Sequence, residues 1–316
     1  MTRPTPTRPA AGTWELTTDP AEFDRVAGAF LRSDRALHTV QLSLLAGLLA
    51  GESQFAGVEP RFGVWRDGSG RVAGSFLQTP PRPPVVGALG PEAARDLVAA
   101  FGGRGLPGVN GPVEDARAVA EAWLERCPGG TLGERRTHRL YRLGRLTPPA
   151  PAPAGRARVA GAADRARVAG AADRARVAGW IKDFSDEGHG GLPGDFTEEQ
   201  ALAWTDSRLS YGGVTLWEAA DGTPLSMASA TRPVAGCVRV TAVFTPKPLR
   251  GRGCAGAVTA EVSRVAEERG ADEVVLFTDL ANPTSNALYQ RLGYRPVRDF
   301  TVLAFRPPPV TATATP

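Results

Sequence analysis

The 316-residue sequence predicts a mixed α/β fold in two domains, on three observations. First, three short strand patterns separated by Gly-containing turns predict an antiparallel meander, at 214–219, 225–231 and 238–245. Second, a helical pattern over 251–269 follows directly, and a strand, a helix and a final strand complete this half. Third, the proline-rich segment 147–155 cannot join the interior of a sheet, so we interpret it as a link between two domains.

The first half also alternates strands and helices. Asp19, Pro20 and Glu22 are spaced as a helix start, with a capping residue, a proline in the first turn and a carboxylate three residues after the cap. One or two helices fill 20–50 in this prediction, and the apolar stretch 42–50 is interpreted as a buried helix, too short to cross a membrane. The other expected elements are strands at 62–65, 71–77, 85–89, 106–109 and 138–143, and helices at 92–101 and 114–126.

The second domain is expected to begin with a strand that leads into a helix. Thr197 with Gln200 forms a capping box, which predicts a further helix to about residue 209. In the long helix, Val258, Val262 and Val265 share one face. The remaining expected elements are a strand at 273–278, a helix at 284–292 and a strand at 294–305. The predicted domains are therefore 13–146 and 156–307, with disordered ends at 1–12 and 308–316.

A nine-residue repeat opens the second domain. Arg-Ala-Arg-Val-Ala-Gly-Ala-Ala-Asp begins at Arg156 and at Arg165, and its first six residues recur from Arg174. Repeat arrays with a function usually have longer units and more copies. We therefore interpret the repeat as a slippage duplication, whose extra copies bulge, lengthen the following helix or stay loose.

Composition argues against several classes of function. A net charge of +4, with no basic run interleaved with aromatics, argues against a nucleic-acid partner. Cys127, Cys237 and Cys254 are widely spaced and fit neither a disulfide framework nor a zinc site, so no metal is expected. Neither a signal peptide nor a membrane-length apolar segment is visible, which predicts a cytoplasmic protein without a membrane partner.

The segment Arg250-Gly251-Arg252-Gly253-Cys254-Ala255 is the candidate binding turn. It fits Arg-x-x-Gly-x-Ala, but the repeat supplies two further matches, so the motif alone is weak. Only this match follows a strand that stops at Pro246, which has no N–H, and opens a helix whose first N–H groups have no internal partner. Such a turn suits a diphosphate, with an extended amide-bearing ligand alongside the strand. The alternative is a plain strand-to-helix turn with solvated arginines.

Four blocks of the second half resemble the acetyl-CoA signature of the GNAT family of N-acetyltransferases, in matching order and spacing. They are Val243-Phe244-Thr245-Pro246, the Arg250–Ala255 turn, Asn282-Pro283-Thr284-Ser285-Asn286-Ala287-Leu288-Tyr289, and Leu292-Gly293-Tyr294-Arg295-Pro296-Val297. The close resemblance covers about 214–305. It implies a splayed, mostly antiparallel sheet flanked by helices, acetyl-CoA as co-substrate in the splay, and direct transfer to an amine.

The resemblance also implies roles for individual residues. The backbone around Val243, Phe244 and Thr245 pairs with the pantetheine arm, and the amides of the Gly-rich turn hold the diphosphate. Asn282 and Asn286 contact the cofactor or hold the loop before the last helix. Tyr289 protonates the departing CoA thiolate, a task that suits a phenol. The alternative for Tyr289 is a tyrosine packed in the core.

The general base is not evident in the sequence. Many members of the family carry a carboxylate near the strand before the Gly-rich turn, whereas 237–244 has none. Glu218 on the first meander strand and Asp299 on the last strand are the candidates, with solvated surface carboxylates as the alternative. An amine of low pKa, or a chain of waters, would need no dedicated base.

Two further features have both a functional and a plain interpretation. A group of polar residues lies where the family binds its acceptor and could recognise a cationic amine, or could form a mobile loop. These residues are Asp183, Asp186, Glu187 and His189. Cys254, at a helix start, could have a lowered pKa. It could equally be a small residue that the turn tolerates.

The first half echoes the order of elements in the second half. A helix, a strand, a turn at Asn110-Gly111-Pro112 and another helix run parallel to the later helix, strand, Asn282-Pro283 turn and helix. We interpret 13–146 as a degenerate GNAT-like domain that does not bind CoA productively, as in bacterial two-domain acetyltransferases of this family. An unrelated helical domain is the alternative.

The leading prediction is an acetyl-CoA-dependent N-acetyltransferase that acts on a small-molecule amine. Two alternatives stay open: a protein N-terminal or lysine acetyltransferase, and a catalytically silent acyl-CoA sensor, which the lack of an obvious base favours. The sequence leaves open which amine is the acceptor. It also leaves the oligomeric state open, with a homodimer as the candidate.

Overall fold

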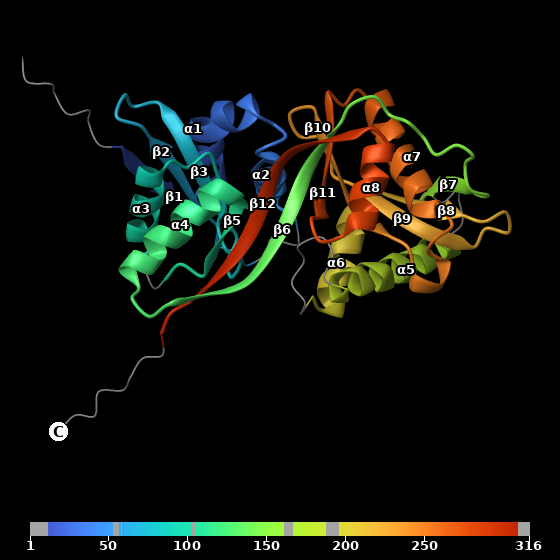
Figure 1. The fold of residues 1–316 in the computed structure, drawn as a ribbon. Helices are drawn as coiled ribbons and strands as arrows, with labels where there is room; N and C mark the ends of the chain where they lie inside the picture. Colours follow the sequence, from blue (N-terminus) through green and yellow to red (C-terminus); the bar gives the residue numbers. More distant parts are fainter. Residues whose placement is uncertain are drawn as a thin grey trace, which may run out of the picture. The chain divides into compact units, whose positions relative to one another are not determined.

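The computed structural model describes residues 12–52, 57, 59–102, 105–160, 167–187 and 196–308. The predictions for 1–11 and 309–316, for 161–166 of the repeat and for His189 lie outside these residues. Contacts divide the chain into two units, and Figure 1 labels their elements. Within the described ranges, no helix combines the length and the apolar character needed to cross a lipid bilayer.

The two units do not follow the chain in simple succession. The first takes in the chain up to Asp34, Gly57–Arg136 and the residues from Phe300 onward, and the second takes in Arg35–Ala56 and Thr137–Asp299. Two long strands, β6 (Thr131–Leu143) and β12 (Tyr294–Arg306), therefore contribute to both units. The predicted domains 13–146 and 156–307 differ from the units at these strands and at helix α2 (Thr39–Leu49), which belongs to the second unit.

The first unit is a six-stranded sheet with helices, in the order β1-β2-β3-β4-β5-β12. Its pairs are antiparallel except for the parallel contact of β4 with β5. Its own elements are β1 (Thr13–Thr17), α1 (Pro20–Ser33), β2 (Arg61–Arg66), β3 (Val72–Gln78), β4 (Val85–Gly87), α3 (Pro91–Ala100), β5 (Gly108–Pro112) and α4 (Val113–Arg126).

Local sequence explains why these elements form. The Asp19 side chain accepts a hydrogen bond from the Ala21 amide at 2.8 Å, which confirms the predicted helix start at Pro20. The core gathers around Trp123, which is fully buried and stacks on Phe305 of β12 with ring centroids 4.7 Å apart. The C-terminal strand thus closes the hydrophobic core of the first unit.

The second unit is also a six-stranded sheet, in the order β6-β11-β10-β9-β8-β7. All its pairs are antiparallel except β10 with β11, which is parallel, and the predicted meander β8–β9–β10 is confirmed. Its own elements are β7 (Arg156–Val159), α5 (Arg167–Asp186), α6 (Glu198–Leu209), β8 (Val214–Glu218), β9 (Pro224–Ala230), β10 (Cys237–Phe244), the short η2 (Lys247–Leu249), α7 (Cys254–Glu268), β11 (Glu273–Asp279) and α8 (Pro283–Arg291).

Two sequence predictions in this unit have clear outcomes. Thr197 and Gln200 exchange side-chain and backbone hydrogen bonds at 3.1 and 3.0 Å, which confirms the capping box of α6. Helix α7 begins at Cys254, not at Gly251 as predicted. The reason is that Gly251 and Gly253 have φ of 78° and 79°, a left-handed conformation that cannot continue a right-handed helix.

The two units repeat one topology. In the first, β4 is followed by α3, β5 and α4, and in the second, β10 is followed by α7, β11 and α8. In each, the strands on either side of the first helix are parallel. The predicted echo between the two halves of the sequence is therefore present in the fold, although β6 and β12 each join the sheet of the other half.

Candidate functional site

Strands β10 and β11 pair along only part of their length. Their parallel register runs from Cys237 opposite Glu273 to Val240 opposite Leu276, and both strands continue beyond it. On its other side β10 has an irregular register with β9 between Thr241 and Phe244, and Ala242 has φ of 47°. The end of β10, which includes the predicted pantetheine contacts, therefore has no register partner in β11 among the described residues.

The Gly-rich turn lies directly after this strand end. Gly253 is the N-cap of α7 and has no side chain to cap the helix, so the first N–H groups of a 15-residue helix meet no capping side chain. Arg250 reaches back along the chain, where its Nε donates to the Thr245 carbonyl at 2.9 Å and its Nη2 lies 2.6 Å from Glu187 Oε2. Arg250 thus ties the turn to the end of β10, while the helix N-terminus remains suited to an anion.

The proline-rich segment after β6 lies against this turn. A Cβ built on Gly253 would lie 3.7 Å from Pro153 Cβ, and one built on Gly256 would lie 3.5 Å from Pro149 Cγ. The indole of Trp217 also donates to the Ala154 carbonyl at 3.2 Å. The segment predicted to be an interdomain linker therefore forms part of the surroundings of the α7 N-terminus.

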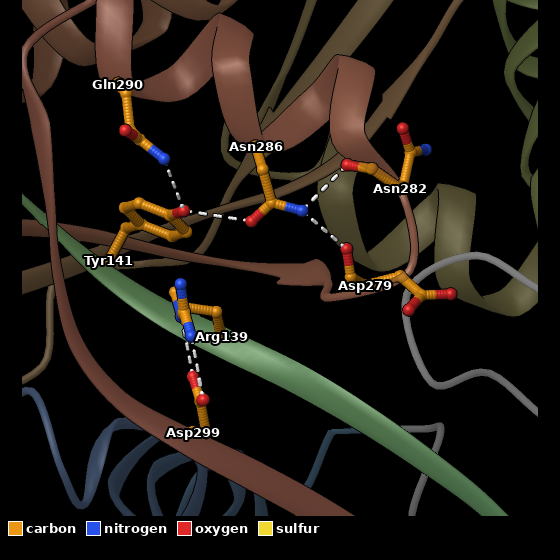
Figure 2. Close-up of polar contacts among 7 residues, drawn as sticks. All are labelled: Arg139, Tyr141, Asp279, Asn282, Asn286, Gln290 and Asp299. Carbon is orange, nitrogen blue, oxygen red and sulfur yellow. Dashed lines mark hydrogen bonds and ion pairs between the residues drawn. The ribbon is translucent and has the colours of Figure 1, made fainter.

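Asn282 and Asn286 hold the loop between β11 and α8 (Figure 2). Asn282 caps α8 by accepting from the Ser285 amide at 3.0 Å. The Asn286 Nδ2 donates to the carbonyl oxygens of Asp279 at 2.8 Å and Asn282 at 2.7 Å. One of the two roles implied by the resemblance, holding this loop, is visible in these contacts, and contact with the cofactor stays a prediction.

Tyr289 lies on α8 and is 7% exposed. Its ring makes an edge contact with Tyr294, whose hydroxyl is 2.7 Å from Ser263 Oγ. Burial raises the pKa of Tyr289, so the phenol keeps its proton at neutral pH. Among the described residues nothing hydrogen bonds to the Tyr289 hydroxyl, although buried tyrosines usually find a partner. The role of Tyr289 as a proton donor stays a prediction.

Glu218 is buried and forms an ion pair with an arginine. Arg158 Nε donates to Glu218 Oε1 at 2.7 Å, and the same guanidinium binds both oxygens of Asp173, at 2.6 and 2.9 Å. Hydrogen bonds to Asp173 and Glu218 raise the pKa of Arg158. Glu218 therefore serves as part of a buried ion-pair cluster that joins β7, α5 and β8.

Asp299 is held in the same way by Arg139 of β6. The two side chains form a bidentate pair with distances of 2.7 and 2.9 Å, and this pair raises the pKa of Arg139 (Figure 2). Both candidate bases are thus counter-ions of arginine. Their assignment as bases stays a prediction, and the ion pairs argue against it because a base must be free to take a proton.

The structure gives Cys254 and two acidic residues of the predicted acceptor region structural contacts. Cys254 is buried, and burial raises the pKa of its thiol, so the structure favours a small residue in the turn over a reactive thiolate. Asp186 pairs with Lys182 at 2.6 Å, and Glu187 pairs with Arg250. Among the described residues, no group of three or more His, Cys, Asp or Glu side chains could hold a metal ion.

Sequence reasoning missed two features near the site. One is Tyr141 of β6, whose hydroxyl donates to Asn286 Oδ1 at 2.9 Å, although it comes from the other half of the sequence. The other is Arg239 in the middle of β10. A charged residue between Val238 and Val240 in an otherwise apolar strand is a signal that the sequence does contain.

A model of a known protein family matches the part of the chain that contains the candidate site. A model of the family described as "Acetyltransferase (GNAT) family" matches residues 178–294. This range contains the end of β10, the Gly-rich turn and α8. A search of curated proteins with the whole sequence finds no match.

Solved structures share the fold over nearly the whole chain at low sequence identity. A GCN5-related N-acetyltransferase from Sphaerobacter thermophilus is 18% identical, with 96% of this chain and 98% of that chain covered and a TM-score of 0.58. A GNAT-family acetyltransferase from Colwellia psychrerythraea is 11% identical, with coverages of 93% and 100% and a TM-score of 0.55. A tandem GNAT protein from the clavulanic acid biosynthesis pathway is 14% identical, with coverages of 95% and 100% and a TM-score of 0.52.

Proposed function

We propose that the protein transfers an acetyl group from acetyl-CoA to an amine, because residues 178–294 match a model of the GNAT acetyltransferase family and the chain shares its fold with a tandem GNAT protein. The observation that carries this proposal is the combination of an unpaired strand end and a Gly-rich helix N-terminus. β10 leaves its register with β11 after Val240, and α7 begins ten residues after the end of β10. Together they offer a backbone edge for an amide-bearing arm and N–H groups for a diphosphate.

The turn binds and orients the donor in this proposal. Gly251 and Gly253 adopt positive φ and carry no Cβ, so a diphosphate can approach the backbone closely. The amides at the start of α7 hold the phosphate oxygens, helped by the partial positive charge of the helix N-terminus. The backbone of Val243 to Thr245 pairs with the pantetheine amides, which places the thioester beyond Val240, where β10 and β11 are no longer paired.

The chemical step then needs a proton donor to the thiolate sulfur and an acceptor for the proton that the amine nitrogen loses. The neutral amine attacks the carbonyl carbon, the carbon–sulfur bond breaks, and Tyr289 gives its phenolic proton to the departing thiolate. The ammonium proton of the product passes to water, and a proton from solvent restores the phenol. The buried phenol is neutral at neutral pH, as an acid that donates to the thiolate must be.

One observation favours the second candidate function, a silent acyl-CoA sensor. Both carboxylates considered as bases, Glu218 and Asp299, are engaged by arginine. An amine that reaches the site unprotonated needs no such base, so the enzyme remains the leading proposal. A small-molecule amine acceptor, and a cytoplasmic location, are part of this proposal.

Calorimetric titration with acetyl-CoA tests the proposal. We expect one binding site per chain, and we expect Gly253→Val to abolish it because a β-branched residue cannot adopt φ of 79° at the turn. Gly270→Val is the matched control, since Gly270 has φ of 84° at the other end of the same helix, where a Cβ would meet open space. It carries the same backbone strain and should keep the site.

Each alternative result has a definite meaning. Two sites per chain would show that the first unit also binds CoA. Absence of binding to the wild-type protein at high micromolar acetyl-CoA would refute the proposed function. Binding without turnover of any amine, unchanged by Tyr289→Phe, would support the sensor.

A further inference from the structure

Three arginines gather on one side of β10. Val238 and Val240 pack with Val258 of α7, so the alternating side chains of Arg239 and Thr241 point to the opposite face of the sheet. On that face α5 and α6 pack against Ala242 and Phe244 through the apolar cluster of Val177, Ile181 and Ala201. Arg208 comes from α6, and Arg232 follows β9.

Tyr211 connects these arginines. Its ring centroid is 5.9 Å from the guanidinium carbon of Arg208 and 4.1 Å from that of Arg232. Arg208 also lies 5.3 Å from the ring of Trp204.

Burial, followed by the nearby positive charge of Arg208, lowers the pKa of Arg239 to about 10. The Tyr211 hydroxyl donates to the Ala230 carbonyl at 2.9 Å, and the Arg239 amide donates to Thr231 Oγ1 at 3.0 Å. Arg239 and the tyrosine ring that contacts Arg208 therefore lie beside adjacent residues.

The cluster lacks the partners that such groups normally have. Arg239 Nη1, Arg208 Nε and Thr241 Oγ1 are all buried, and none of them has a hydrogen-bond partner in the described part of the chain. Arg232 pairs with Glu52 at 3.9 Å, and in the same part of the chain no ion pair joins Arg208 or Arg239 to a carboxylate. The two arginines are half-buried, yet within the described residues each has one buried nitrogen without a hydrogen-bond partner and neither has a counter-ion. Such unsatisfied groups are unfavourable, so their presence calls for a partner outside the chain.

The position of the cluster relates it to the proposed site. The regular pairing of β10 with β9 is interrupted near Ala242, which has a positive φ. Arg239 lies three residues before Ala242, which is about 10 Å of extended strand. Thr241 lies between them on the same face. The diphosphate position at the start of α7 is a separate one, since α7 packs on the other face of β10.

We propose that Arg208 and Arg239 bind a carboxylate on the acceptor, so that the acceptor is an amine that also carries a carboxylate group. Guanidinium groups bind carboxylates through paired, charge-assisted hydrogen bonds, and the hydroxyl of Thr241 offers a further contact toward the reacting end. The distance along β10 from Arg239 to Ala242 suits an acceptor whose amine and carboxylate are several bonds apart. This inference rests on the proposed acetyl transfer.

The test compares charged acceptors with uncharged ones of the same shape. Initial rates of CoA release are measured with γ-aminobutyrate and ε-aminocaproate, and with the primary amide of each. We expect the carboxylates to have kcat/KM at least tenfold above their amides, and we expect Arg239→Met to remove this preference while acetyl-CoA affinity is unchanged. Arg264→Gln, which removes an exposed arginine paired with Glu261 on α7, is the matched control and should keep the preference.

A second readout does not depend on turnover. The wild-type protein is treated with phenylglyoxal, and modified arginines are mapped by mass spectrometry. ε-Aminocaproate should protect Arg208 and Arg239, and its amide should not. Because Arg239→Met removes a half-buried charge that has no counter-ion in the described ranges, the ligand-free variant should unfold at a temperature no lower than the wild type, whereas a purely structural Arg239 would lower it.

The outcomes separate this inference from the proposed function. Equal rates for acids and amides, or no protection, with acetyl-CoA binding intact would overturn the carboxylate assignment alone. Absence of acetyl-CoA binding would remove the proposed function, and the acceptor assignment with it, even where the protection by ε-aminocaproate persists.

Discussion

The hydroxyl of Tyr141 donates to the side-chain oxygen of Asn286 at 2.9 Å, across a separation of 145 residues. The same hydroxyl accepts from Gln290 Nε2 at 3.2 Å, and Asn286 holds the Asp279 and Asn282 carbonyls with its other end (Figure 2). Tyr141 is fully buried, so its hydroxyl depends on Asn286 and Gln290 for hydrogen-bond partners.

Tyr141→Phe should therefore lower the free energy of unfolding by about 1 kcal/mol, because it removes the hydrogen bond that the half-buried Asn286 side chain accepts. Urea unfolding followed by tryptophan fluorescence measures this. Tyr141→Phe with an unchanged urea midpoint would show that the network adds nothing to stability. Gln290→Ala, which removes only the longer contact, is the milder control.

Tyr289→Phe should lower kcat by about 10²-fold and leave the affinity for acetyl-CoA unchanged, because the phenol acts as the acid only when the thiolate leaves. Steady-state rates and calorimetry on the same preparation separate the two quantities. Tyr294→Phe is the control, since it removes the buried bond to Ser263 and should cost stability with little effect on turnover. Equal losses of turnover in both variants would assign Tyr289 a packing role only.

Arg158→Met should destabilise the second unit by about 3–5 kcal/mol, because it removes the arginine that pairs with two buried carboxylates, Glu218 and Asp173. Thermal unfolding measures the loss. In the same series, Glu218→Gln should keep most of the activity per folded molecule, as expected of a structural counter-ion. A fall in kcat of a hundredfold in Glu218→Gln would instead identify Glu218 as the base.

Stability should fall as the pH rises above about 10. Burial raises the pKa of Tyr211, Tyr289 and Tyr294, three of the four tyrosines of the chain, above the ordinary value near 10. Above that pH the unfolded chain loses phenolic protons that the folded chain keeps, so the unfolded state binds fewer protons and stability declines with pH. Below pH 10 these three phenols do not make the free energy of unfolding depend on pH.

Absorbance of phenolate during alkaline titration checks this. In the folded protein the buried tyrosines should ionise only together with unfolding, in one steep step. A gradual titration of these three tyrosines near pH 10, with the fold intact, would contradict the burial of their phenols.

The sequence predicted much of the second unit because its signals are local. The turns between 214 and 245 sit between short apolar strands, and Thr197 with Gln200 marks a helix start by itself. The start of α7 was placed three residues early, because the pattern of apolar residues cannot show that Gly253 adopts a left-handed conformation.

The exchange of β6 and β12 was not predicted, because it depends on contacts between distant residues. The alternation of His138 to Leu143 indicates a half-buried strand but carries no information on which strand pairs with it. The structure pairs this segment with β11, at Tyr141 opposite Leu276. The arginine cluster was missed for the same reason, since Arg208 and Arg239 meet only when α6 packs on the sheet.

The exchanged strand β12 also sets an order of events during synthesis. Residues Phe300 to Ala304 pair with β5, so the sheet of the first unit is incomplete until the ribosome has passed residue 304. Until then β5 exposes an unpaired edge, the kind of surface at which nascent chains associate wrongly. Strands β1 to β5 are thus translated before strands β6 to β11 of the second unit, but their sheet is finished after these, and a chain that stops before Phe300 would leave it unclosed.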